Sequence, residues 1–338
     1  MSVWLPSAPC SPQACVEAGS AAAALPRAGA RFTAVVALVL LGVLVSVVGL
    51  RPPAGVVRCW CRWTVRASGV RVRITGTAPA TGGLLLVANH VSWLDIPLLG
   101  AVRPARMLAK SDIRAWPVAG PLVARGGVLF IERDRIRALP ETVARVADAL
   151  RAGAAVVAFP EGSTWCGRAQ GRFRRAVFQA ALDADVPVQP VRVRYRSTGG
   201  GASTAPAYVG DDSLLSSVWR VVSATDVVAE VDVRPVIAPA AHLDRRALAG
   251  AAQTAVTDVA AMAEHLPDAG GGRRGVRPAS VRGLRRREGA RAETGSGTRS
   301  GVSVGRDPRS GPVACTSPAV PRGRTYSSSP GSPGRPSP

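Results

Sequence analysis

An apolar run at residues 84–88 stops at a polar cluster, and this change constrains the fold more than any other feature of the chain. The sequence LLLVA has the length and composition of a short strand that is buried on both faces. Asn89, His90, Ser92 and Asp95 follow it directly. Open α/β sheets hold their reactive groups where a buried strand turns into a helix. We therefore expect an α/β fold with His90 at the edge of its sheet.

His90 and Asp95 can form a general base if the chain bends between them. Five residues correspond to a rotation of about 140° on a straight helix, so a straight helix would separate the two side chains. A carboxylate bonded to one imidazole nitrogen fixes the tautomer and leaves the other nitrogen to take a proton from a hydroxyl. The alternative is that His90 caps a loop and Asp95 a helix, and Ser92 is a further candidate for the helix cap. The spacing alone leaves both interpretations open.

Downstream, short apolar runs alternate with segments of helical period, which is typical of a layered α/β fold. We predict a central mixed sheet flanked by helices. The prolines at 187 and 190 predict either that the sixth strand lies at an edge of the sheet or that the strand starts there. The predicted strands cover residues 70–74, 84–88, 107–110, 128–131, 155–159, 186–195 and 227–237, and the predicted helices cover residues 94–102, 139–151, 173–184 and 247–266, with a broken helix at 113–125.

The N-terminal part predicts a membrane anchor. Residues 1–31 are rich in Ala, Pro and Ser and are predicted to be disordered. Residues 32–50 carry no charge and are long enough to cross a hydrocarbon core of about 30 Å, although a buried core helix passes the same test. Arginines are denser after this run than before it, which predicts a single anchor in the cell membrane with the rest of the chain in the cytoplasm.

Residues 51–69 predict a basic amphipathic helix, because Arg58, Arg62 and Arg66 recur every four residues beside apolar positions. Such a helix lies at lipid headgroups or is an ordinary solvated helix. Residues 70–266 then form the catalytic domain. Residues 267–338 are rich in Gly, Arg, Ser and Pro, and we predict that this tail is disordered.

The charge and the cysteines narrow the possible partners. The formal net charge is +21, and the sequence contains no nucleic-acid module, so anionic lipid is the expected partner rather than nucleic acid. Lys110 is the only lysine in the chain. The six cysteines are scattered, and no histidine is spaced to complete a zinc set with any of them. The sequence therefore predicts reduced thiols and no metal.

Two further strands end in polar turns. The run GVLFIER places Arg133 after a strand, where a guanidinium can bind a phosphate through two hydrogen bonds, although a surface arginine has the same pattern. The run FPEGST places Glu161, Gly162 and Ser163 after the next strand. We expect both turns to lie near His90, because parallel strands end at one edge of a sheet.

The blocks NHVSWLD, GVLFIER, FPEGST and VPVQPV resemble, in order and spacing, the four blocks of the glycerolipid acyltransferases, the family that includes bacterial 1-acyl-sn-glycerol-3-phosphate acyltransferase. The resemblance covers roughly residues 70–240. It implies that His90 and Asp95 are catalytic and that Arg133, Glu161, Gly162 and Ser163 bind the acceptor, with Lys110 as a second phosphate contact. Asn89 and Ser92 are then candidates for stabilising the oxyanion or for structural support.

The resemblance implies transfer of an acyl group from acyl-CoA or acyl carrier protein to a lysophospholipid hydroxyl, with no cofactor and no metal. It favours 1-acyl-sn-glycerol-3-phosphate as the acceptor. The third block departs from the usual Phe-Pro-Glu-Gly-Thr-Arg, because Ser163, Thr164 and Trp165 follow Gly162 and the usual arginine is missing. Arg168 or Arg172 can replace that arginine. This departure resembles the lyso-ornithine lipid acyltransferases, whose acceptor has no phosphate. Another lysolipid acceptor, a hydrolase and a non-catalytic membrane lipid-binding protein are also compatible with these residues.

Overall fold

A computed structural model of the chain describes residues 8–17, 25–111, 127–131, 136–241 and 244–257. Within this part, seven strands form one sheet in the order β1-β7-β6-β2-β5-β3-β4. All neighbouring strands are parallel except β6 and β7, so the sheet is mixed, as predicted. The strands are β1 (Arg71–Thr75), β2 (Leu84–Ala88), β3 (Arg106–Lys110), β4 (Leu129–Ile131), β5 (Ala155–Ala158), β6 (Val188–Ser197) and β7 (Val227–Val233).

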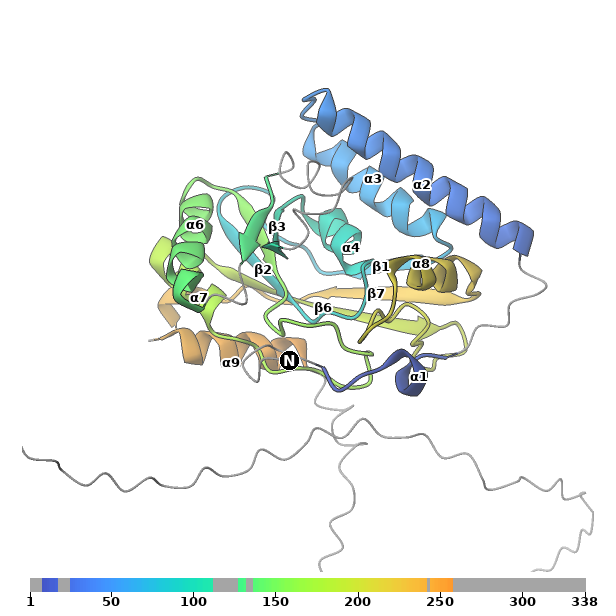
Figure 1. Ribbon diagram of the computed structural model, residues 1–338. Helices are drawn as coiled ribbons and strands as arrows, with labels where there is room; N and C mark the ends of the chain where they lie inside the picture. Colours follow the sequence, from blue (N-terminus) through green and yellow to red (C-terminus); the bar gives the residue numbers. More distant parts are fainter. Residues whose placement is uncertain (1–7, 18–24, 112–126, 132–135, 242–243, 258–338) are drawn as a thin grey trace, which may run out of the picture. The chain divides into compact units, whose positions relative to one another are not determined.

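Helices cover both faces of this sheet (Figure 1). One core cluster packs one face against α6 (Leu139–Arg151), α7 (Ala176–Ala184) and α9 (Arg245–Val256). The other core cluster packs the opposite face against α3 (Ala54–Ala67), α4 (Asp95–Val102) and α8 (Leu214–Ser223). Two 3₁₀ turns, Ile136–Ala138 and Pro239–Ala241, precede α6 and α9. Strand β2 is buried at every position because it lies between these two layers.

The parallel strands β2, β3, β4 and β5 place their carboxyl ends at the same edge of the sheet. β2 pairs with β5 on one side and with β6 on the other, and β3 lies between β5 and β4. The two described turns, after β2 and after β5, therefore meet at one edge, where open α/β sheets bind their ligands.

The N-terminal part has more structure than its composition predicts. The expectation of disorder through residue 31 is wrong for two segments, since α1 (Pro12–Cys15) and the first residues of α2 (Leu25–Val47) are helical. The reason is packing against the rest of the chain. Cys10 and Cys15 are buried in a core cluster, and the Arg31 guanidinium donates to the carbonyl groups of Val222 and Ala224 at the C-terminal end of α8.

Helix α2 carries the apolar run but begins at Leu25 and ends at Val47, so it does not match residues 32–50. Among the described residues it alone is long and apolar enough to cross a membrane. It packs against α3, where the Trp60 indole donates to the Leu38 carbonyl, and against α8. Most of its apolar side chains nevertheless stay exposed, including Leu40, Leu41 and Leu44. Such a surface is compatible with a membrane anchor.

Other predicted elements differ in detail. The prolines do not mark an edge strand, because β6 lies inside the sheet. Pro187 precedes the strand. Pro190 lies one residue before Val191, where the pairing of β6 with β7 begins. Helix α8 was not predicted. Helix α9 ends at Val256, short of residue 266. The broken helix at 113–125 and the tail at 267–338 lie outside the described residues.

Candidate active site

The chain bends between β2 and α4, and this bend brings His90 and Asp95 together. Nδ1 of His90 lies 2.9 Å from Oδ2 of Asp95. The Asp95 side chain is fully buried, whereas 20% of the His90 side chain is exposed. A proton on Nδ1 therefore points at the carboxylate, and Nε2 is the nitrogen that remains to accept a proton from a substrate. This arrangement has the geometry of a general base, which the spacing alone left open.

Four donors hold the Asp95 carboxylate in place. Oδ2 accepts from the backbone N–H groups of Val91 at 2.7 Å and Ser92 at 2.9 Å, in addition to the His90 ring. Oδ1 accepts from the Tyr195 hydroxyl of β6 at 2.6 Å. Burial and the neighbouring Asp95 carboxylate raise the pKa of Tyr195 well above its usual range, so the hydroxyl stays a donor. The carboxylate is thus fixed before any substrate binds.

Sequence reasoning missed Tyr195. A signal was present, since Val191, Val193 and Tyr195 alternate along the strand and share one face of it. A buried tyrosine hydroxyl usually has a hydrogen-bond partner. The partner is Asp95, which is 100 residues away in the chain. Only the pairing of β6 with β2 shows which residue it meets.

Glu161 holds the backbone of His90. Its Oε2 accepts from the His90 N–H at 2.8 Å, and its Oε1 accepts from the Gly171 N–H at 3.1 Å. The pKa of Glu161 is raised to about 8, mainly because its side chain is buried; the two backbone N–H groups lower this pKa, and the nearby Asp95 carboxylate raises it. The two carboxyl groups beside His90 therefore have different roles, since Glu161 accepts from two backbone N–H groups while Asp95 also bonds the imidazole ring.

The rest of the turn after β5 also contacts His90. The Phe159 ring stacks on the His90 imidazole with a centroid distance of 3.9 Å. The backbone N–H of Trp165 donates to the His90 carbonyl at 2.8 Å. Gly162 adopts a φ of 75°, which explains why glycine stands at this corner of the turn. Ser163 follows it and is half-buried.

The contacts of Asn89 and Ser92 indicate that these two residues support the structure of the site. The Asn89 amide donates to the Val193 carbonyl at 2.9 Å and accepts from the Val193 N–H at 2.8 Å, so it continues the pairing of β2 with β6. The Ser92 hydroxyl accepts from the Leu94 N–H at 3.2 Å. The expectation that Ser92 is the N-cap is wrong, because Leu94 precedes α4 and Ser92 stabilises the turn before it.

The structure describes the phosphate-binding candidates only in part. Lys110 is the last residue of β3, and its backbone pairs with Ile131, the last residue of β4. Its side chain and the whole of Arg133 lie outside the described residues. Of the two possible replacements for the missing arginine, Arg168 forms an ion pair with Glu17 at 3.2 Å, and Arg172 is exposed.

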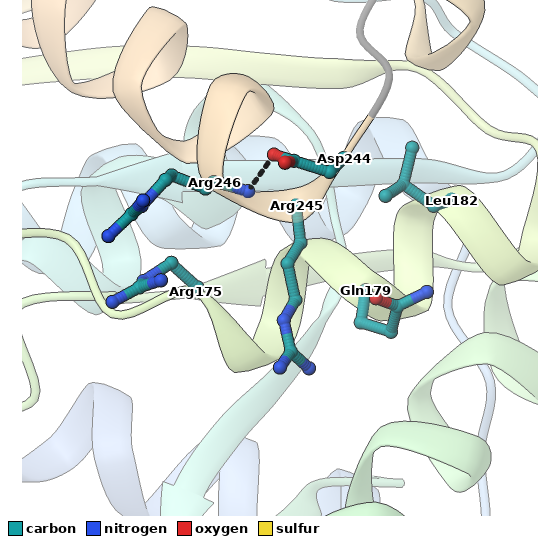
Figure 2. A pocket seen from close by; sticks show the side chains of 6 residues that line it. All are labelled: Arg175, Gln179, Leu182, Asp244, Arg245 and Arg246. Atoms are coloured by element: carbon teal, nitrogen blue, oxygen red, sulfur yellow. Dashed lines mark hydrogen bonds between the residues drawn. The ribbon is translucent and has the colours of Figure 1, made fainter.

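A pocket of about 540 Å³ between α7 and α9 is separate from this site. Figure 2 shows that it is lined at one side by Arg175, Gln179 and Leu182, and at the other by Asp244, Arg245 and Arg246. The Asp244 carboxylate caps α9 by accepting from the Arg246 and Ala247 N–H groups. Since no predicted site residue lines this pocket, we place the chemistry at the edge of the sheet beside His90.

A mixed α/β sheet with a buried Asp95, a partly exposed His90 at a strand end and an exposed apolar helix is compatible with a membrane-associated enzyme that uses a general base. Comparisons with known proteins make this class specific. Residues 69–194 match the family model described as Acyltransferase. This match includes the four motifs from NHVSWLD to VPVQPV.

Three relatives illustrate the match. The chain is 40% identical over 201 residues to the lyso-ornithine lipid O-acyltransferase of Pseudomonas aeruginosa, which covers 59% of this chain and 76% of the relative. It is 36% identical to the 1-acyl-sn-glycerol-3-phosphate acyltransferase of Neisseria meningitidis, over 55% of this chain and 73% of the relative. The crystal structure of PlsC, the 1-acyl-sn-glycerophosphate acyltransferase of Thermotoga maritima, aligns with a TM-score of 0.46 at 18% identity, over 60% of this chain and 76% of PlsC. This chain belongs to the acyltransferase family, and it is an O-acyltransferase of lipid metabolism.

Proposed function

We propose that this chain transfers a fatty acyl group from acyl-CoA or acyl carrier protein to the free hydroxyl of 1-acyl-sn-glycerol-3-phosphate, giving phosphatidic acid. The observation that carries the proposal is the His90–Asp95 pair at 2.9 Å beside the buried Glu161 turn. Membership of the family supplies the reaction class. The protein's own residues need no cofactor for this reaction, since acyl-CoA or acyl carrier protein enters as a co-substrate.

The geometry supports direct transfer. Asp95 orients His90, and Nε2 of His90 removes the proton from the acceptor hydroxyl as its oxygen attacks the thioester carbonyl. The tetrahedral intermediate then collapses, the C–S bond breaks, and the proton on His90 passes to the leaving thiolate. A backbone N–H group is the proposed oxyanion donor, since the Asn89 side chain is bonded to β6 on both its donor and acceptor atoms. No covalent intermediate on the protein is required.

The acceptor phosphate is proposed to bind Lys110 and Arg133, with Glu161, Gly162 and Ser163 shaping the site beside it. The register of the sheet supports this proposal, because Lys110 ends β3 next to β5, and Ile131 ends β4 two residues before Arg133. Both strands therefore end at the edge that carries His90. We propose that an acceptor whose phosphate binds at this edge has its glycerol hydroxyl near Nε2 of His90.

Replacing Arg133 with alanine is expected to lower turnover on 1-acyl-sn-glycerol-3-phosphate about 10- to 150-fold, because a charge-assisted hydrogen bond contributes about 1.5–3 kcal/mol. Arg137, which is exposed on the turn before α6, provides a matched control as Arg137→Ala. Rates for both variants are measured with one acyl-CoA and purified membranes. Equal rates for the two variants would remove Arg133 from the acceptor site.

A second acceptor, lyso-ornithine lipid, is favoured by one observation. Thr164 stands where the family usually has an arginine, so this turn supplies no guanidinium for a phosphate. An acceptor without phosphate needs no such arginine. A panel of lysolipid acceptors separates the two candidates, since the proposal requires acylation of 1-acyl-sn-glycerol-3-phosphate. Acylation of lyso-ornithine lipid alone would assign that acceptor, and fatty acid release without any acceptor would indicate a hydrolase.

We also propose that α2 anchors the enzyme in the cell membrane. Substituting both Leu40 and Leu44 with aspartate is expected to move the protein to the soluble fraction, because a charge at the centre of a membrane helix costs roughly 2.5–3.5 kcal/mol. Both leucines are exposed in the fold, so the change leaves the core intact. Val236→Asp, at an exposed apolar residue after β7, is the control. A double variant that stays on membranes at high salt would place the anchor elsewhere.

The catalytic domain is proposed to face the cytoplasm, which the excess of arginines after the apolar run supports. Cys59 of α3 is exposed and lies close to the start of this domain in the chain. A thiol reagent that cannot cross membranes is expected to label Cys59 in inverted vesicles and not in intact cells. Cys59→Ser vesicles provide the control for labelling at other cysteines. Labelling of Cys59 in intact cells would reverse the orientation.

A further inference from the structure

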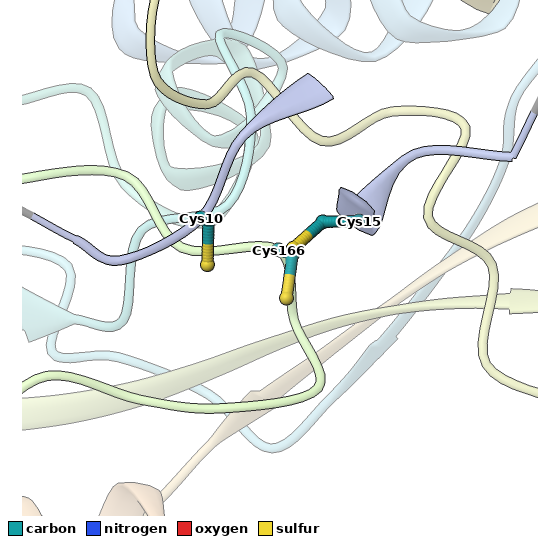
Figure 3. A group of neighbouring side chains, drawn as sticks. All are labelled: Cys10, Cys15 and Cys166. Atoms are coloured by element: carbon teal, nitrogen blue, oxygen red, sulfur yellow. The ribbon is translucent and has the colours of Figure 1, made fainter. Parts of the chain in front are cut away.

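Three cysteines that are scattered in the sequence form one buried cluster. The sulfur atoms of Cys10, Cys15 and Cys166 all lie within 4.8 Å of one another. Figure 3 shows that two of them come from the N-terminal segment and the third from the loop after β5. All three side chains are buried, and no disulfide joins any two of them. The fold thus assembles a group of soft ligands that the spacing in the sequence did not predict.

The distances suit a bound cation better than a disulfide. Zinc binds thiolate sulfur at about 2.3 Å in a tetrahedron, which places the sulfur atoms about 3.8 Å apart. The three sulfur atoms lie within 4.8 Å of one another, so small rotations of the side chains bring them to this spacing. A disulfide has a sulfur–sulfur bond of about 2.05 Å and would use only two of the three cysteines. Three converging sulfur atoms are the ligand set of a soft metal ion.

Two structural features make this cluster more than three cysteines in a core. Ser11 caps the short helix α1, with its hydroxyl accepting from the Ala14 N–H, and this turn brings Cys15 back toward Cys10. The backbone of the same segment approaches Gly210 so closely that an added Cβ there would lie 3.1 Å from the Cys10 carbonyl oxygen. Gly210 has a φ of 63°, so both space and conformation require glycine. The segment is therefore held at a defined position against the domain.

We propose that Cys10, Cys15 and Cys166 bind one Zn²⁺ ion as thiolates. Binding releases three protons and gives a three-thiolate site with a net charge of −1. Among the described residues, no fourth His, Cys, Asp or Glu atom belongs to the cluster. The proposed ion takes no part in acyl transfer, and the inference does not depend on the proposed function.

The position of Cys166 gives this ion a structural role. Cys166 directly follows Trp165, whose N–H donates to the His90 carbonyl. The next residue, Gly167, has a φ of 85° and lies against Val91. The N-terminal segment also packs into the core through Cys10 and Cys15, and it is bonded to the domain by the Glu17 N–H bond to Thr204 and the Glu17–Arg168 ion pair. An ion at the cluster would fix both this segment and the turn that holds His90.

Metal content of the full-length protein in detergent tests the proposal directly. We expect about one zinc ion per chain after purification with a reductant and without chelators. Cys10→Ser, Cys15→Ser and Cys166→Ser are each expected to lower this content to less than about a tenth. Cys61→Ser is the matched control, because Cys61 is buried between α3 and α4 away from the cluster. It should keep the zinc content of the unchanged protein.

A second measurement uses the wild-type protein, so its result does not depend on whether a variant folds. Chelator-treated wild-type protein is titrated with Co²⁺, and a site with three cysteines is expected to show thiolate-to-cobalt charge-transfer absorption that saturates at one ion per chain. Loss of this absorption on addition of Zn²⁺ would show that both ions share the site. The proposal is overturned if wild-type protein holds no zinc and gives no such absorption. It is also overturned if the intact mass without reductant is lower by two hydrogen atoms, which would indicate a disulfide.

Discussion

The His90→Ala enzyme is expected to transfer acyl groups about 10²–10⁴-fold more slowly than the unchanged enzyme, the usual contribution of a general base. His90 is the only imidazole at this edge among the described residues, and its Nδ1 is engaged by Asp95. The side chain is partly exposed, so its removal creates no large internal cavity. Initial rates at saturating acyl-CoA, normalised to the amount of protein in the membrane fraction, measure the effect.

Expression and membrane association should remain unchanged in the His90→Ala enzyme. The backbone bonds of residue 90 to Glu161 and Trp165 do not involve the imidazole, so the turn keeps its supports. Thermal unfolding of the two proteins provides the structural control. A loss of less than about tenfold with normal folding would show that His90 is not the base.

The sequence predicted the parts of this site that are encoded locally. His90 and Asp95 lie five residues apart, and Glu161 follows the apolar run of β5 directly, so strand ends made them candidates, while the resemblance to the family supplied their roles. Tyr195 was not predicted, because its contact with Asp95 spans 100 residues and depends on which strand neighbours β2. The three-cysteine cluster was missed for the same reason, since Cys166 comes from a distant loop.

The fold shows the same division between local and tertiary information. The limits of α6 were predicted without error, because its apolar residues follow a helical period and Gly153 ends the pattern. Helix α8 was missed, since its short apolar sequence is interrupted by serines and arginine. Residues 8–17 have a composition typical of disorder, but burial of Cys10 and Cys15 in the core orders them. Tertiary packing thus overrides composition in this segment.

Asp95→Asn is expected to lower the rate on the order of 10²–10³-fold while keeping the ring of His90 in place. The asparagine amide oxygen can replace Oδ2, which accepts from the His90 ring and from the N–H groups of Val91 and Ser92. The amide nitrogen then faces the Tyr195 hydroxyl, which rotates to accept from it. The position of the ring survives, but the negative charge that stabilises the developing imidazolium is lost.

Two matched variants separate the charge effect from the structural one. Tyr195→Phe removes one donor to Asp95 and leaves its charge, so we expect less than about a tenfold loss of rate. Asp212→Asn removes a carboxylate that is nearly as buried as Asp95 and that pairs with Arg220 at 2.6 Å away from the site. This control should lower thermal stability without a comparable loss of rate. If all three variants lost equal activity, the effect of Asp95→Asn would be structural.

The double variant His90→Ala with Asp95→Asn provides the decisive comparison. Because Asp95 acts only through His90, removing it from an enzyme that already lacks the imidazole should cost almost nothing further, and the double variant should match His90→Ala within about threefold. Residues that act independently would instead multiply their effects, giving a loss on the order of 10⁴-fold or more. Multiplied losses would mean that Asp95 contributes through the turn that it holds rather than through the base.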